Sequence, residues 1–217
     1  MTDSPKLINM SNILTRSLLT SLFVLLASCA GQPQKTMPEK ATAEKPVAAT
    51  KPGAISKQEH ALYKEALTSL YKNDLDNAES QFKQLIKMRD DLAGPWANLA
   101  LVYYNKKQPD QARKMITESF QRNPRQANAI NLLGVLELDD GKIKPALEHF
   151  KQAVALRPDY ANAHYNLAYT YDIYFQDARN AADQYIQYMK LIRNQDKVTG
   201  EWLDQLMGYI KKSPEKK

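Results

Sequence analysis

Residues 93–126 read AGPWANLALVYYNKKQPDQARKMITESFQRNPRQ, and this pattern decides the fold. The stretch that follows directly, 127–160, repeats it as ANAINLLGVLELDDGKIKPALEHFKQAVALRPDY. Small residues and a closing proline recur at one constant interval, in the pairs Ala100 and Gly134, Ala112 and Ala146, and Pro124 and Pro158. An interval of about 34 residues is typical of stacked helical hairpins, each of which needs its neighbours to bury its apolar face.

Weaker copies of the pattern lie on both sides, at 59–92 and 161–194. The last copy carries one extra residue in the turn before Ala181. The small residues let the two helices of a hairpin approach closely, and the proline ends the second helix. After 194, the apolar residues Trp202, Leu206 and Ile210 share one helical stripe, which predicts a capping helix over 199–211.

Position by position, these copies resemble the tetratricopeptide repeat (TPR). Residues 93–126 match it through Trp96, Leu99, Ala100, Tyr103, Ala112, Ile116, Ser119 and Pro124. Residues 127–160 match nearly as well, with Glu137 in place of the family's tyrosine, and Asp90 replaces the proline in 59–92. The resemblance implies an all-α fold, a TPR superhelix or α-solenoid of about four repeats at 59–92, 93–126, 127–160 and 161–194.

Residues 1–28 resemble a lipoprotein signal peptide. The apolar run 18–26 has the length of a signal-peptide core and is too short for a permanent membrane span. Leu26-Ala27-Ser28-Cys29 follows it and resembles the lipobox of bacterial lipoproteins. In that family the signal is cut before the cysteine, which then receives acyl chains such as palmitate, so we expect lipidation of Cys29. The alternative is an incidental cysteine after an ordinary signal.

Ala30 stands where an aspartate would favour retention at the inner membrane, as the lipoprotein resemblance implies. We therefore expect a lipid-anchored protein on the periplasmic face of the outer membrane of a Gram-negative bacterium. Translation starts at Met1 or at Met10, and the residues leave both open. Residues 29–57 are rich in Ala, Lys and Pro and predict a disordered tether. The repeats and capping helix then fill 58–212, before a disordered tail at 213–217.

Composition and motifs argue against chemistry and nucleic-acid binding. The net charge of +6 comes from the ends of the chain, because residues 58–210 carry a net charge of −1. No basic face on the repeats is implied, so no nucleic-acid partner is expected. The three histidines have no helical metal-ligand spacing, and no phosphate loop or catalytic arrangement occurs. We therefore expect a protein that is not an enzyme, with no metal site and no cofactor.

Proteins of the TPR family usually bind peptides or proteins on the concave face, which the first helix of each repeat lines. Carried onto this chain, the resemblance gives these binding residues: Tyr63, Leu67, Tyr71, Ala97, Leu101, Tyr104, Asn105, Asn128, Asn131, Val135, Leu138, Asn162, Tyr165 and Tyr169. Tyrosines offer large contact areas and asparagines can bind an extended backbone. The alternative is that several of these tyrosines only pack between repeats.

The layout of lipobox, tether and several TPRs is similar to that of outer-membrane lipoproteins of type IV and Tad pilus assembly. It therefore implies a periplasmic adaptor whose partner is a protein or peptide, for example a secretin or pilus component. One alternative is a scaffold for peptidoglycan enzymes or general envelope assembly. Another, of a different class, is binding of envelope polymer by the basic tether, with the repeats forming a homo-oligomer.

Overall fold

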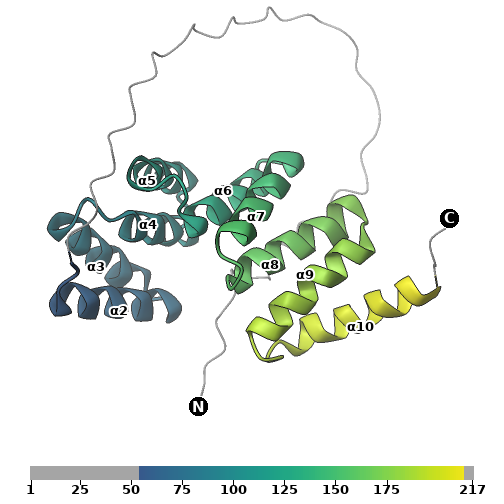
Figure 1. Ribbon diagram of the computed structural model, residues 1–217. Helices are drawn as coiled ribbons and strands as arrows, with labels where there is room; N and C mark the ends of the chain where they lie inside the picture. The colour runs from purple at the N-terminus through teal and green to yellow at the C-terminus, as the bar shows by residue number, and fades with distance from the viewer. Residues whose placement is uncertain (1–53, 213–217) are drawn as a thin grey trace, which may run out of the picture. The chain divides into compact units, whose positions relative to one another are not determined.

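The computed structural model describes residues 54–212, and in this range it is entirely helical (Figure 1). Its elements are α2 (Lys57–Tyr71), α3 (Leu75–Met88), α4 (Ala93–Asn105), α5 (Pro109–Arg122), α6 (Ala127–Asp139), α7 (Ile143–Leu156), α8 (Ala161–Tyr169), the π-helix η1 (Thr170–Phe175), α9 (Ala178–Leu191) and α10 (Lys197–Lys212). The predicted signal peptide, Cys29, most of the tether and the tail at 213–217 lie outside the described residues.

Consecutive helices pair as hairpins, namely α2 with α3, α4 with α5, α6 with α7, and α8 with α9. Each hairpin packs against the next one, and α10 packs on α9. The helices therefore follow one another along the stack, as Figure 1 shows by its colour order. Contacts of this nearest-neighbour kind are typical of a repeat protein.

Local sequence sets the ends of the helices. α2 begins with a capping box, in which the Ser56 hydroxyl accepts from the Glu59 N–H and the Glu59 carboxylate accepts from the Ser56 N–H. Each hairpin turn contains one left-handed residue, and the first three such residues are Asn73, Lys107 and Gly141. They are evenly spaced along the sequence, so the three turns are built in the same way.

The fourth turn differs because its left-handed residue, Gln176, comes one position later than the same spacing would place it. The extra residue is taken up by η1, which widens the end of the first helix into a π-helix. In the third turn the Lys142 N–H donates to Glu137, five positions back, whereas in the fourth the Asp177 N–H donates to Tyr171, six positions back. The widened turn also leaves three apolar side chains exposed, those of Ile173, Tyr174 and Phe175.

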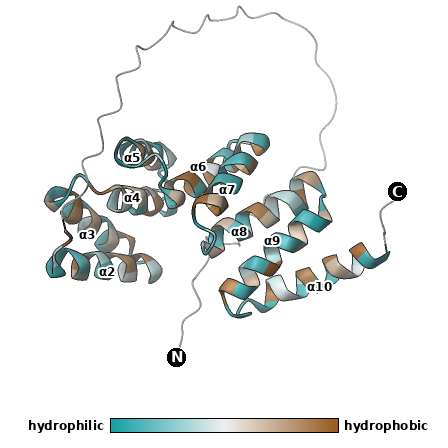
Figure 2. Cartoon of the chain, viewed as in Figure 1, coloured by the Kyte–Doolittle hydropathy of each residue, from teal (hydrophilic) through white to brown (hydrophobic). Residues whose placement is uncertain are grey.

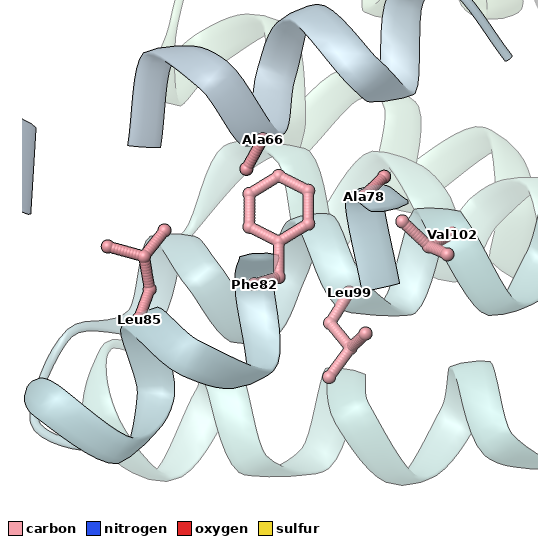
Figure 3. Close-up of a cluster of buried hydrophobic side chains, with 6 residues drawn as sticks. All are labelled: Ala66, Ala78, Phe82, Leu85, Leu99 and Val102. Carbon is pink, nitrogen blue, oxygen red and sulfur yellow. The ribbon is translucent and has the colours of Figure 1, made fainter. Parts of the chain in front are cut away.

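Small residues bring the helices of each hairpin into contact. Figure 3 shows the first part of the core, where the Phe82 ring of α3 points toward Ala66 of α2. Leu99 and Val102 of α4 extend the same cluster to the second hairpin. In the third hairpin a glycine is needed, because a Cβ on Gly134 would lie 2.7 Å from the fully buried ring of Phe150.

The terminal helix α10 is amphipathic, and polar and apolar residues alternate along its ribbon in Figure 2. Of its residues only Thr199 is fully buried, while Trp202, Leu203 and Leu206 are half-buried. The helix therefore covers the end of the stack with the start of its apolar stripe and leaves Tyr209, near its C-terminus, 61% exposed.

Candidate functional site

The predicted binding residues all lie on α2, α4, α6 and α8, the first helices of the four hairpins. We call the side of these helices that carries them the first-helix face. Nine of the residues are half-buried: Tyr63, Leu67, Leu101, Tyr104, Asn105, Asn128, Leu138, Asn162 and Tyr169. Tyr71 is 62% exposed at the end of α2. These ten residues offer surface to a partner.

The other four predicted residues are buried, namely Ala97, Asn131, Val135 and Tyr165. They pack against neighbouring helices, so they support the first-helix face from below and present almost no area to a partner. The Tyr165 ring, for example, lies 5.2 Å from that of Tyr188 and 6.0 Å from that of Tyr185, both edge-to-face. Sequence position alone could not separate these supporting side chains from those at the surface.

Polar side chains bridge adjacent hairpins along this face. Asn98 donates from Nδ2 to the Tyr63 hydroxyl at 2.7 Å, and Asn166 donates to Oδ1 of Asn131 at 3.0 Å. Both bonds join residues with the same separation in the sequence, so they occupy equivalent places in the stack. Neither Asn98 nor Asn166 was among the residues predicted from the sequence. The signal that could have identified them is an amide one position after a concave-face residue.

Comparison with known proteins agrees with this geometry. A family model described as "Tetratricopeptide repeat" matches residues 93–126, and a second, described as "TPR repeat", matches residues 134–172. The described helices form a TPR superhelix. This confirms the predicted fold class, and the TPR repeats support a role in protein–protein interaction. No curated protein matches the chain in sequence.

Solved TPR structures resemble the chain in fold. A structure of PilF of Pseudomonas aeruginosa superposes with a TM-score of 0.58 and 17% identity, covering 71% of this chain and 69% of PilF. A thermophilic TPR protein of Thermus thermophilus gives a TM-score of 0.56 and 22% identity, covering 70% of this chain and 82% of its own. At these identities the likeness concerns the fold alone.

Burial changes the acid–base properties of the tyrosines on the first-helix face. Desolvation raises the pKa of Tyr63, and the hydrogen bond from Asn98 opposes this rise. Burial likewise raises the pKa values of Tyr165 and Tyr169. These phenols therefore keep their protons at neutral pH. They act as hydrogen-bonding groups with large apolar rings.

A cation stacks on a tyrosine at the turn between the third and fourth repeats. Arg157, which follows α7, places its guanidinium carbon 3.8 Å from the centre of the Tyr160 ring. Its positive charge works against the rise in the pKa of Tyr63 that burial causes.

An open pocket of about 450 Å³ lies elsewhere in the TPR domain, between the start of α9 and the end of α10. Its lining consists of Phe175, Gln176, Asp177, Ala178, Arg179, Tyr209 and Ile210. Across residues 54–212, no group of three or more His, Cys, Asp and Glu side chains could hold a metal ion. In the same part of the chain, no helix is long and apolar enough to cross a bilayer.

Proposed function

We propose that this protein is a membrane-anchored periplasmic adaptor that binds a partner protein or peptide along the first-helix face of its TPR repeats. The observation that carries the proposal is the row of accessible aromatic and aliphatic side chains on successive first helices. In this row Tyr71 is 62% exposed, and Leu101, Tyr104 and Tyr169 are half-buried. Large accessible side chains of this kind are the usual anchors of an interface.

The accessible tyrosines of this face, Tyr71, Tyr104 and Tyr169, suit the binding of a partner. A tyrosine can bury roughly 150–250 Å² and still donate a hydrogen bond through its hydroxyl. Tyr104 and Asn105 are the last two residues of α4, so the end of this helix offers a partner both an aromatic ring and an amide. The bonds from Asn98 and Asn166 link the hairpins, and such preorganisation reduces the entropy lost when a partner binds.

A photo-crosslinking amino acid in place of Tyr71 tests this proposal in living cells. The matched control is Tyr209, which is equally accessible at 61% but lies on α10, away from the first-helix face. We expect the probe at position 71 to capture a distinct partner that the probe at 209 does not. Equal adducts at both positions would refute binding at this face, and capture of only further copies would favour self-association.

The anchor is a separate part of the proposal and rests on the lipobox-like residues Leu26 to Cys29. With several acyl chains attached to Cys29, membrane binding is firm, because each buried CH₂ contributes about 0.8 kcal/mol. Cys29→Ser should therefore release the protein into the periplasm or leave its precursor at the inner membrane. Unchanged fractionation with the outer membrane would contradict acylation.

We propose pilus or secretin assembly as the first context in which to look for the partner. The support is the layout of lipobox, tether and TPR domain in the sequence. Deletion of the protein should then reduce the amount of heat-resistant secretin multimer in the outer membrane. Normal multimers in the deletion strain would shift attention to a peptidoglycan-enzyme scaffold.

A further inference from the structure

The terminal helix α10 carries two apolar stripes, one of which packs on the stack. This first stripe is buried or half-buried and consists of Thr199, Leu203, Leu206 and Ile210. Because α10 packs on α9 at the end of the stack (Figure 1), the burial of these side chains places the first stripe on the α9 side. The contact is close, since a Cβ added to Gly200 would lie 3.3 Å from Cε of Met189 in α9.

The second stripe of α10 is accessible at both of its ends. It consists of Val198, Trp202 and Tyr209, which lie within about 40° of one another around the helix and about 90° from the first stripe. Val198 is 50% exposed and Tyr209 is 61% exposed, whereas Trp202 between them is half-buried. Tyr209 also lines the open pocket of about 450 Å³, so the apolar surface continues to Phe175. An apolar surface left open in this way indicates an interaction site.

The spacing of the second stripe fits another helix. With Gln205 included, its positions 198, 202, 205 and 209 follow one another at alternating steps of four and three residues. This is the spacing at which the side chains of two paired helices interlock, and the rings of Trp202 and Tyr209 supply large contact areas. The stripe therefore accommodates a partner that is itself an α-helix.

The charges of α10 favour a second copy of the same helix as that partner. The first half contains Lys197, Glu201 and Asp204 and is net acidic, and the last turn carries the basic residues Lys211 and Lys212. Two copies laid antiparallel bring each acidic half beside the basic end of the other copy, whereas a parallel pair would align like charges. The two carboxylates also disfavour an anionic membrane surface as the occupant.

We propose that the second stripe of α10 is the contact surface of a homodimer in which the α10 helices of two copies pack antiparallel. A two-fold axis uses the same patch on both copies, so one stripe is enough to form the interface. Tyr209 of each copy then lies beside the first half of the other copy's α10. This surface is separate from the first-helix face, so the dimer does not depend on what the adaptor binds there.

A photo-crosslinking amino acid in place of Tyr209 tests this surface in the full protein in cells. We expect an adduct of twice the mass of the protein, and mass spectrometry should map the captured residue to the first half of α10 in the second copy. The matched control is the same probe in place of Ile55, which is 56% exposed before α2 and should give no such adduct. Capture near position 209 itself, capture of a different protein, or no adduct would each overturn the antiparallel homodimer.

Sedimentation of the purified full protein in detergent measures the dissociation constant of the dimer. Lys211→Glu with Lys212→Glu should weaken dimerisation about tenfold, because like charges then face each other across the two-fold axis. Further replacement of Glu201 and Asp204 by lysine reverses every charge of the pair and should restore the affinity. Thermal unfolding shows whether each variant remains folded. A monomeric unaltered protein, or a reversal that restores nothing, would contradict the proposal.

Discussion

Replacement of Gly134 by alanine should destabilise the third repeat, although alanine is the better helix former. Gly134 lies in the middle of α6, and an added Cβ would lie 2.7 Å from Cε1 and 3.0 Å from Cδ1 of Phe150. The Phe150 ring is fully buried and cannot move without disturbing its neighbours. Overpacking of this kind costs about 1–3 kcal/mol. The helix propensity of alanine returns about 1 kcal/mol, so we expect a net loss of about 1 kcal/mol.

Gly208→Ala is the matched control, because Gly208 lies within α10 and an added Cβ there meets nothing within 4 Å. This variant should gain about 0.5–1 kcal/mol from helix propensity alone. Unfolding in guanidinium chloride measures the change in the free energy of unfolding for each of the two variants relative to the unaltered protein. A second test is the double variant Gly134→Ala with Phe150→Leu, which should lose less than the sum of its single changes.

The assay must also locate the loss, since a stack of repeats can unfold in parts. Hydrogen exchange should show weaker protection in α6 and α7 and little change in α2 and α3. If Gly134→Ala stabilised the protein as much as Gly208→Ala does, the close approach of Phe150 would not be the reason for the glycine.

Further predictions concern charge and capping. The Glu79 carboxylate accepts from Lys106 at 2.6 Å, and this bond, with that from Lys83, lowers the pKa of Glu79 to about 2. The ionised Glu79 carboxylate contributes about 1 kcal/mol to the free energy of unfolding after solvent screening, and this contribution is present above pH 4.5 and lost as the pH falls toward 2. Glu79→Gln should therefore make the free energy of unfolding depend less on pH in that window. An unchanged pH dependence would contradict the assignment. Asp196→Ala removes the hydrogen bonds to the Thr199 N–H and to the buried hydroxyls of Thr199 and Tyr188. We expect a loss of about 1–3 kcal/mol, seen as faster exchange in α10, and full protection there would refute it.

The sequence predicted the fold because the repeating small residues serve one steric purpose in every hairpin. Ala66, Ala100, Gly134 and Ala168 stand at the same position in successive hairpins and are all buried, and at Gly134 the Phe150 ring of the second helix leaves no room for a Cβ. The constant spacing of these small residues was enough to predict that the helices of each hairpin pack closely, without knowledge of the individual contacts.

Single departures from the pattern were harder to interpret. Glu137 stands where the second and fourth repeats have tyrosine, Tyr103 and Tyr171. In the structure its carboxylate lies 2.7 Å from Nδ1 of His149 on the second helix. A hydrogen bond of this kind depends on two residues in different helices, and neither is unusual by itself. The sequence showed that the tyrosine is replaced by Glu137, but it could not show that Glu137 pairs with His149.

The sequence could place the predicted binding residues on the first helices but could not tell which of them are accessible. Helical position placed Tyr71 and Tyr165 on the same side of the stack, but Tyr71 is 62% exposed and Tyr165 is 9% exposed. The difference arises from neighbours distant in sequence, since Tyr185 and Tyr188 of α9 close over Tyr165.

The wide turn at η1 shows how this chain tolerates a change in length. An additional residue in an ordinary α-helix would rotate everything after it by about 100° and carry the apolar stripe away from its neighbour. Here the π-helix at Thr170–Phe175 takes up the additional residue, so Ala181 and Tyr185 stay buried at the positions that correspond to those of the preceding hairpin. Deletion of one residue within this π-helix should therefore leave the packing of the other helices unchanged. The same deletion in α4 or α6 would displace every later hairpin.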